Sequence, residues 1–144
     1  MESLILPFLG KELLSKAFSE TSSGIYSGLE ELKKYNHYDF EKLIIQLDLE
    51  IKIQIIESYI KYIEENIHNE TIKLNVDSIL SIIKKINIEI TDINSEIIYH
   101  KTKWLNSMRN PNIKSKIDNL INHSILFDKR IDLLLKFNFN FNSK

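Results

Sequence analysis

A long heptad pattern occupies the third quarter of the chain and constrains its fold more than any other feature. Apolar residues recur there at alternating intervals of three and four positions, and the pattern comprises Val76, Ile79, Ile83, Ile86, Ile90, Ile93, Ile97, His100 and Trp104. This spacing aligns one stripe along a helix, as in coiled coils and helical bundles. We expect Asn75 or Asp77 to cap the helix start and the "RNPN" turn at residues 109–112 to stop it.

A second stripe follows in the last quarter. Pro111 suits the first helical position behind Asn110 as the cap. Its seam comprises Ile113, Ile117, Leu120, Ser124, Phe127, Ile131 and Leu134. The final "KFNFNFNSK" alternates Phe and Asn, and we interpret it as a loosely packed terminus rather than a strand for a partner. We therefore expect one helical-bundle domain over residues 1–137 and a short Phe/Asn tail over residues 138–144.

The second quarter first resembles a strand, because "LDLEIKIQI" at residues 47–55 alternates apolar and polar residues. A wider window instead shows two helical stripes about 130° apart. One stripe comprises Phe40, Ile44, Leu47, Ile51, Ile55, Tyr59 and Tyr62, and the other comprises Ile45, Leu49, Ile53, Ile56, Ile60, Ile63 and Ile67. We predict a single helix of roughly 30 residues, capped by Asp39, that touches two neighbours.

The first quarter contains the unusual stretch "SETSSGIYSG" at residues 19–28, which could be a loop. The 144 residues include only three glycines and two prolines, so long uninterrupted helices are expected. Matching the length of the other helices makes residues 4–35 one helix, bent near residues 22–24. The predicted fold is all-α: an elongated antiparallel up-down-up-down four-helix bundle with coiled-coil-like packing.

Small residues gather on one face of this first helix, within about 60° of one another on a helical wheel. They are Gly10, Ala17, Thr21, Gly24 and Gly28. One interpretation is close packing against a sister helix, because small side chains let two backbones approach. The other is a groove that accepts a partner helix, a second copy of the chain or a membrane surface.

The charges are distributed unevenly. Up-down topology brings a basic cluster to one end of the bundle, comprising Lys33, Lys34, Lys101, Lys103, Arg109, Lys114 and Lys116, with Trp104 beside it. Acidic residues gather at the opposite end, at Glu64, Glu65, Glu70 and Asp77. This basic end is either solvated surface charge or a site for phosphate, acidic lipid or an acidic protein.

The sequence favours neither catalysis nor a metal site. It lacks Cys and a glycine-rich phosphate loop, and the pair Glu65 and His68 has no second Glu-x-x-His to complete a di-metal bundle site. His100 lies on a seam, where it is either a hydrogen-bonded core residue or a pH-sensitive group. The net charge of −1 disfavours nucleic-acid binding. We expect a non-enzymatic protein without a cofactor.

Three segments together carry a resemblance. They are "SSGIYSGLEEL" (residues 22–32), "LDLEIKIQIIESYIKYI" (residues 47–63) and "YHKTKWLNSMR" (residues 99–109). The chain resembles small uncharacterised helical proteins of large DNA viruses with AT-rich genomes. This resemblance implies a setting in the host cytoplasm or the virion, and it implies no functional residue.

These observations predict an interaction module that binds another protein or itself as a homo-oligomer, in a viral structural or host-interaction role. The alternative is engagement of a membrane surface through the amphipathic segment "LILPFLGKELLSKAF" at residues 4–18 and the basic end. No basic region precedes the first apolar run, and no stretch is long and apolar enough to span a bilayer, so we expect a cytoplasmic protein.

Overall fold

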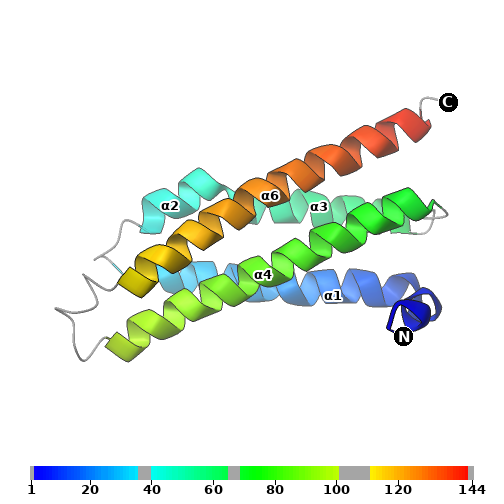
Figure 1. Ribbon diagram of the computed structural model, residues 1–144. Coiled ribbons are helices and arrows are strands. Elements are labelled where there is room, and N and C mark those ends of the chain that lie inside the picture. The colour runs from blue at the N-terminus through cyan, green and yellow to red at the C-terminus, as the bar shows by residue number, and fades with distance from the viewer. Residues whose placement is uncertain (1, 36–39, 65–68, 101–110, 143–144) are drawn as a thin grey trace.

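The computed structural model describes residues 2–35, 40–64, 69–100 and 111–142, and every secondary-structure element in these ranges is an α-helix. The elements are α1 (Glu2–Leu32), α2 (Phe40–Leu47), α3 (Leu49–Glu64), α4 (Glu70–His100) and α6 (Pro111–Asn142). Figure 1 shows them as an elongated bundle with the long helices lying lengthwise. The predicted all-α class and helical-bundle architecture are thus confirmed.

The first helix is continuous. α1 runs from Glu2 to Leu32 without interruption at residues 22–24, so the small-residue stretch is the middle of a helix rather than a loop. The Thr21 hydroxyl donates a hydrogen bond to the Ala17 carbonyl at 2.9 Å, and the buried Ser22 hydroxyl donates one to the Phe18 carbonyl at 2.7 Å. These bonds satisfy polar side chains that would otherwise be costly to bury.

α1 packs closely against both α3 and α4. Gly24 of α1 lies beside Asn87 of α4, and Gly28 lies beside Ile90 and Asn94. Residue numbers therefore increase together along the two helices, so α1 and α4 are parallel. The first and third helices of an up-down-up-down bundle run in the same direction, so this parallel pair is compatible with the predicted order, and the small side chains of α1 let α4 approach it directly.

The most extensive helix–helix packing in the described part of the chain is between α4 and α6. Lys116 near the start of α6 pairs with Asp92 in the second half of α4, at 3.9 Å. Further along α6, Arg130 donates a hydrogen bond to the carbonyl of Ser78 in the first half of α4, at 2.7 Å. Residue numbers run in opposite senses, so α4 and α6 are antiparallel. α4 thus packs against both α1 and α6.

The predicted single helix in the second quarter is wrong in one respect, because it is interrupted at Asp48. Asp48 has a φ of 51°, in the left-handed region, and it separates α2 from α3. The Asp48 amide still donates to the Ile44 carbonyl at 3.0 Å, and the Lys52 amide donates to the Asp48 carbonyl at 3.3 Å. Aspartate tolerates this conformation better than most residues, so the helix ends and restarts around one residue.

The interruption changes which apolar stripe is buried. In α2 the buried residues, Phe40 and Leu47, belong to the first predicted stripe. In α3 they belong to the second stripe, and they are Leu49, Ile53, Ile56, Ile60 and Ile63. The sequence had predicted one helix that buries two apolar stripes against two neighbours. The pair α2 and α3 does not do this. Each half buries one stripe and leaves part of the other exposed.

Replacement of Asp48 tests this interruption. We expect Asp48→Asn to leave the free energy of unfolding nearly unchanged, because Asn also adopts positive φ readily, and Asp48→Val to lower it by about 1–2 kcal/mol. Urea denaturation of both variants measures the difference. Within a continuous helix, Asn and Val have similar propensities, so equal stabilities of the two variants would contradict the left-handed conformation.

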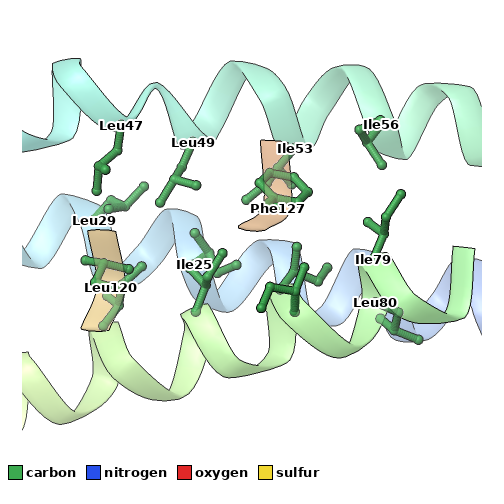
Figure 2. Packing of buried hydrophobic residues seen from close by; sticks show 14 of the residues in the cluster. Ile25, Leu29, Leu47, Leu49, Ile53, Ile56, Ile79, Leu80, Leu120 and Phe127 are labelled. Atoms are coloured by element: carbon green, nitrogen blue, oxygen red, sulfur yellow. The ribbon is translucent and has the colours of Figure 1, made fainter. Parts of the chain in front are cut away.

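The apolar seams predicted from the heptads form the centre of the core. In α4 the buried seam residues are Val76, Ile79, Ile83, Ile86, Ile90, Ile93 and Ile97. In α6 they are Ile113, Leu120, Ser124, Phe127 and Leu134, with Ile117 and Ile131 partly buried. Figure 2 shows Phe127 of α6 and Ile53 of α3 in the space between the helices, with Ile25 of α1 below them.

Two helix boundaries differ from those predicted. α4 starts at Glu70 rather than near Asn75, because the Asn69 side chain accepts hydrogen bonds from the amides of Thr71 and Ile72, at 2.8 and 3.3 Å. Asn69 is therefore the N-cap. α6 begins at Pro111 as predicted but continues to Asn142, so most of the predicted Phe/Asn tail is helical. Extending an existing helix needs no new nucleus.

Candidate functional site

The outer face of α3 carries a stripe of large apolar side chains. Ile51, Ile55 and Tyr62 are 54%, 62% and 75% exposed. Their spacing of four and seven positions aligns them on one side of the helix, and exposed Ser58 lies between them on the same side. We call Ile51, Ile55, Ser58 and Tyr62 the α3 stripe. Contiguous exposed apolar side chains of this kind mark interaction surfaces more often than isolated ones do.

One edge of the α3 stripe is tied to α6. Lys52 lies on this edge, and its ammonium group contacts the Asp128 carboxylate at 2.9 Å and donates a hydrogen bond to the Leu47 carbonyl at 3.1 Å. Both partners of the ion pair are partly exposed, so the pair adds little stability. The pair does show which side of α3 faces α6.

The other edge of the α3 stripe carries a row of charged and polar side chains, spaced three or four positions apart. They are Glu50, Gln54, Glu57 and Lys61. Burial raises the pKa of Tyr26 in α1, and the negative charges of Glu57 and Glu50 raise it further. This edge therefore faces the α1 side of the bundle. Lys61 and Gln54 are exposed, and Glu50 and Glu57 are half-buried.

The small-residue face of α1 is covered by α4 at two of its five positions. A Cβ atom added at Gly24 would lie 2.8 Å from Asn87 Oδ1, and one added at Gly28 would overlap Ile90 Cγ2. Thr21 is buried and Ala17 packs against the core, whereas the surroundings of Gly10 lie outside the described side chains. At Gly24 and Gly28, therefore, the small-residue face packs closely against another helix of the same chain, α4.

Two asparagines of α4 accompany this close approach. Asn94 donates a hydrogen bond from Nδ2 to the Gly28 carbonyl at 3.1 Å, which requires the α1 backbone to lie near α4. The Oδ1 atoms of Asn87 and Asn94 are buried without a hydrogen-bond partner among the described residues. Such groups are costly to bury, so this interface combines tight packing with imperfect polar pairing.

The basic end is only partly within the described residues. Figure 1 places the end of α1 and the start of α6 at the same end of the bundle, so Lys33, Lys34, Lys114 and Lys116 lie there. Lys33 contacts Glu30 at 2.9 Å and Lys34 contacts Glu31 at 3.1 Å, and the hydrogen bond to Glu30 raises the pKa of Lys33.

Carboxylates offset much of the charge at this end, since Lys116 also has Asp92 nearby. Lys114 is exposed. The remaining members of the predicted cluster lie outside the described residues, and they are Lys101, Lys103, Trp104 and Arg109. The described residues thus form a mixed surface of both signs rather than a purely basic one.

A Glu–His pair between α4 and α6 was not identified from the sequence. Glu89 Oε1 contacts His123 Nδ1, and the Glu89 side chain is only 14% exposed. Burial raises the pKa of Glu89 and the charge of Asp92 raises it further, while His123 and Lys85 oppose this shift. The two residues lie one position from seam residues on each helix, and no local motif connects them. The predicted seam histidine, His100, ends α4, and its side chain lies outside the description.

The raised pKa of Glu89 predicts a pH dependence. A carboxyl group that holds its proton more tightly when folded contributes stability below its ordinary pKa, near 4.5, and that stability is lost as pH rises through the folded value. We expect Glu89→Gln to gain stability relative to the wild type as pH rises through this window, by about 1.4 kcal/mol per unit of pKa difference. Urea denaturation from pH 4 to pH 8 measures it, with the exposed Asp132→Asn as control. A gain of equal size at every pH would contradict the assignment.

The described ranges contain no group of three ligand-type side chains that could hold a metal ion. Glu65 and His68 of the Glu-x-x-His pair fall outside those ranges. Within the same ranges, none of the helices combines the length and apolarity required to cross a membrane.

Comparison with known proteins agrees with the viral resemblance. The chain is 26% identical to a protein of Acanthamoeba polyphaga mimivirus described as "Uncharacterized protein L717", over 83% of this chain and 72% of the mimivirus protein. No protein family profile matches the chain, and no solved structure matches it either. The similarity to an uncharacterised protein of a giant virus is therefore established, and it assigns no function.

Proposed function

We propose that this chain is a non-enzymatic interaction module, an up-down-up-down bundle with coiled-coil-like packing that binds another protein or itself in a viral structural or host-interaction role. The observation that supports this most is the exposure of large apolar side chains along the outer faces of the helices. Besides the α3 stripe they include Leu74 and Ile88 on α4 and Ile125, Leu133 and Leu135 on α6.

This exposure is informative because the core is already complete without these residues. The apolar seams of α4 and α6 are buried, and α3 fills its inner face with a full stripe of aliphatic side chains. Exposing further large apolar side chains costs solubility and adds little to the stability of a monomer. A partner that covers them would gain roughly 25 cal/mol for each Å² of apolar surface removed from water.

Site-specific photo-crosslinking tests the proposal. A photoreactive amino acid is placed at Ile55, Ile88 or Leu133, one position at a time, in cells that produce the full chain, with the exposed polar residue Lys129 as the matched control. We expect a discrete crosslinked protein, either the chain itself or another protein, at one or more apolar positions and not at Lys129. Crosslinking no stronger than that at Lys129 from all three positions would overturn the proposal.

The membrane alternative makes a different prediction. Engagement of a lipid surface requires the full chain to float with vesicles that contain anionic lipid at low salt, and to be released as salt screens the charges. The interaction module predicts that the protein stays in the dense fractions. Flotation that is lost when Lys114 and Lys116 are both replaced by Glu would favour the membrane function instead.

A further inference from the structure

We propose that the α3 stripe binds the α3 stripe of a second copy of this chain, with the two helices antiparallel about a two-fold axis near their middle. This inference rests on the proposed function and names its partner. Identical surfaces that meet across a two-fold axis must be self-complementary, and both the apolar and the charged residues of α3 meet this requirement.

The apolar residues satisfy the requirement by their spacing. The α3 stripe follows intervals of four, three and four positions, which read the same in both directions. Antiparallel pairing therefore places Ile51 beside Tyr62 of the partner subunit and Ile55 beside Ser58 of the partner subunit. The small Ser58 leaves room for the larger Ile55, as interdigitating side chains require. The Tyr62 hydroxyl remains at the rim, where water can reach it.

The charged edge satisfies the requirement by its order. Along the edge that faces α1, the first residue is Glu50 and the last is Lys61, one turn beyond Glu57. In an antiparallel pair, Glu50 of each copy lies near Lys61 of the partner subunit, so the contact occurs twice. A parallel partner related by a two-fold axis would instead place this edge beside the opposite edge of the partner helix, where Lys52 is already paired with Asp128. Glu50 and Lys61 would then not meet across the interface, so only the antiparallel orientation uses their opposite charges.

Both charges are available for this role. Neither Glu50 nor Lys61 has an ion-pair partner within the described part of the chain, whereas Lys52 on the opposite edge is already paired with Asp128 of α6. The interruption at Asp48 explains why this surface exists at all. It lets α2 bury the first apolar stripe while α3 buries the second, so Ile51 and Ile55 are left facing outward.

Sedimentation velocity over a range of concentrations tests the inference on the full chain. We expect a monomer–dimer equilibrium that Ile55→Glu weakens about a hundredfold, because each copy loses an apolar contact and buries a carboxylate. The matched control is Ile88→Glu on α4, which is similarly exposed and should leave the equilibrium unchanged. Circular dichroism checks that both variants keep the helical fold, as expected for exposed positions.

A charge exchange tests the orientation. We expect Lys61→Glu to weaken the dimer at least tenfold at low salt, since two Glu–Lys contacts become two Glu–Glu contacts. The double variant E50K/K61E restores opposite charges in the antiparallel arrangement and should recover the dimer. Failure of the double variant to recover it would overturn the antiparallel pairing.

The outcomes separate this inference from the proposed function. A wild-type chain that stays monomeric up to about 1 mM, where binding would be worth only about 4 kcal/mol, overturns the inference. So does a dimer that responds to Ile88→Glu and not to Ile55→Glu. In either case, crosslinking of a different protein would leave the proposed function standing. A monomer that crosslinks to nothing contradicts both.

Discussion

Replacing Phe127 by Ala will lower the free energy of unfolding by about 3–5 kcal/mol, one of the largest effects we expect from a single truncation in this chain. The Phe127 ring is fully buried and belongs to the central apolar cluster. Its removal deletes apolar surface from the core and leaves a cavity that the surrounding rigid helices can fill only in part. Chemical denaturation of the variant measures the loss, and an unchanged m-value would show that the unfolding transition remains comparable.

The control for Phe127 is Ile125 on the same helix. Ile125 is 49% exposed, and its replacement by Ala should cost about 1 kcal/mol or less, since Ala partly offsets the lost burial by its higher helix propensity. The contrast tests the rotation of α6 about its axis. Equal costs for Phe127→Ala and Ile125→Ala would mean that α6 presents a different face to the core.

The burial of Phe127 also illustrates what sequence could predict. Phe127 lies in a seam of apolar residues spaced alternately three and four positions apart, and this spacing identified it as a core residue. The same spacing identified the buried isoleucines of α4. Such a pattern is local, because helix geometry alone determines which residues share a face. The all-helical class and the start of α6 at Pro111 follow from the same local information, whereas the continuity of α1 is predicted by matching its length to that of the other helices.

The interruption at Asp48 could not be predicted in this way. A left-handed residue costs little at Asp and gives no periodic pattern of its own. Whether α2 and α3 form one straight helix depends on how Phe40 and Ile53 reach the core together, which is a property of the tertiary packing. The consequence for the site is large, because this one residue determines that Ile51 and Ile55 face outward.

Pairing between helices was likewise beyond local information. The small-residue face predicted that something approaches α1 closely, and it did not identify which helix or in which direction. Only the structure brings Gly28 to Asn94 and Glu89 to His123, since each pair joins residues far apart in the sequence. Partner choice depends on the whole arrangement of the bundle, and heptads of similar composition on several helices allow more than one arrangement.

The approach of α1 to α4 is the basis of the second large effect. We expect Gly28→Ala to destabilise the fold by about 1–3 kcal/mol, the usual cost of an added methyl group in a packed interface. Its Cβ atom would overlap Cγ2 of Ile90, which is fully buried and attached to a β-branched carbon that cannot turn aside. The cost should appear despite the gain of about 1 kcal/mol that Ala normally brings to a helix interior.

Gly24→Ala is the matched control, one turn earlier on the same face. Its Cβ atom would lie 2.8 Å from Asn87 Oδ1 and 3.0 Å from Nδ2, the far end of a side chain that can rotate. The helix propensity of Ala should then balance the small displacement, so we expect a change within about 0.5 kcal/mol. Thermal and urea denaturation of the two variants give the comparison.

A double-mutant cycle identifies the contact responsible. Ile90→Leu removes the methyl group on the β carbon and keeps the apolar volume, so on its own it should cost less than about 1.5 kcal/mol. Combined with Gly28→Ala, it should recover part of the loss, with a coupling of about 0.5–3 kcal/mol between the two positions. Additive effects would show that Ile90 is not the obstacle.

The same measurement decides between the two interpretations of the small-residue face. If α4 covers Gly28 in solution, an added methyl group destabilises the monomer itself, and stability falls at every protein concentration. If the face were instead an open groove for a partner, Gly28→Ala would leave the isolated chain as stable as Gly24→Ala does and would weaken only association. A destabilised monomer thus excludes the groove at Gly28 and leaves the exposed apolar faces of the helices, the α3 stripe among them, as the surfaces on which a partner is to be sought.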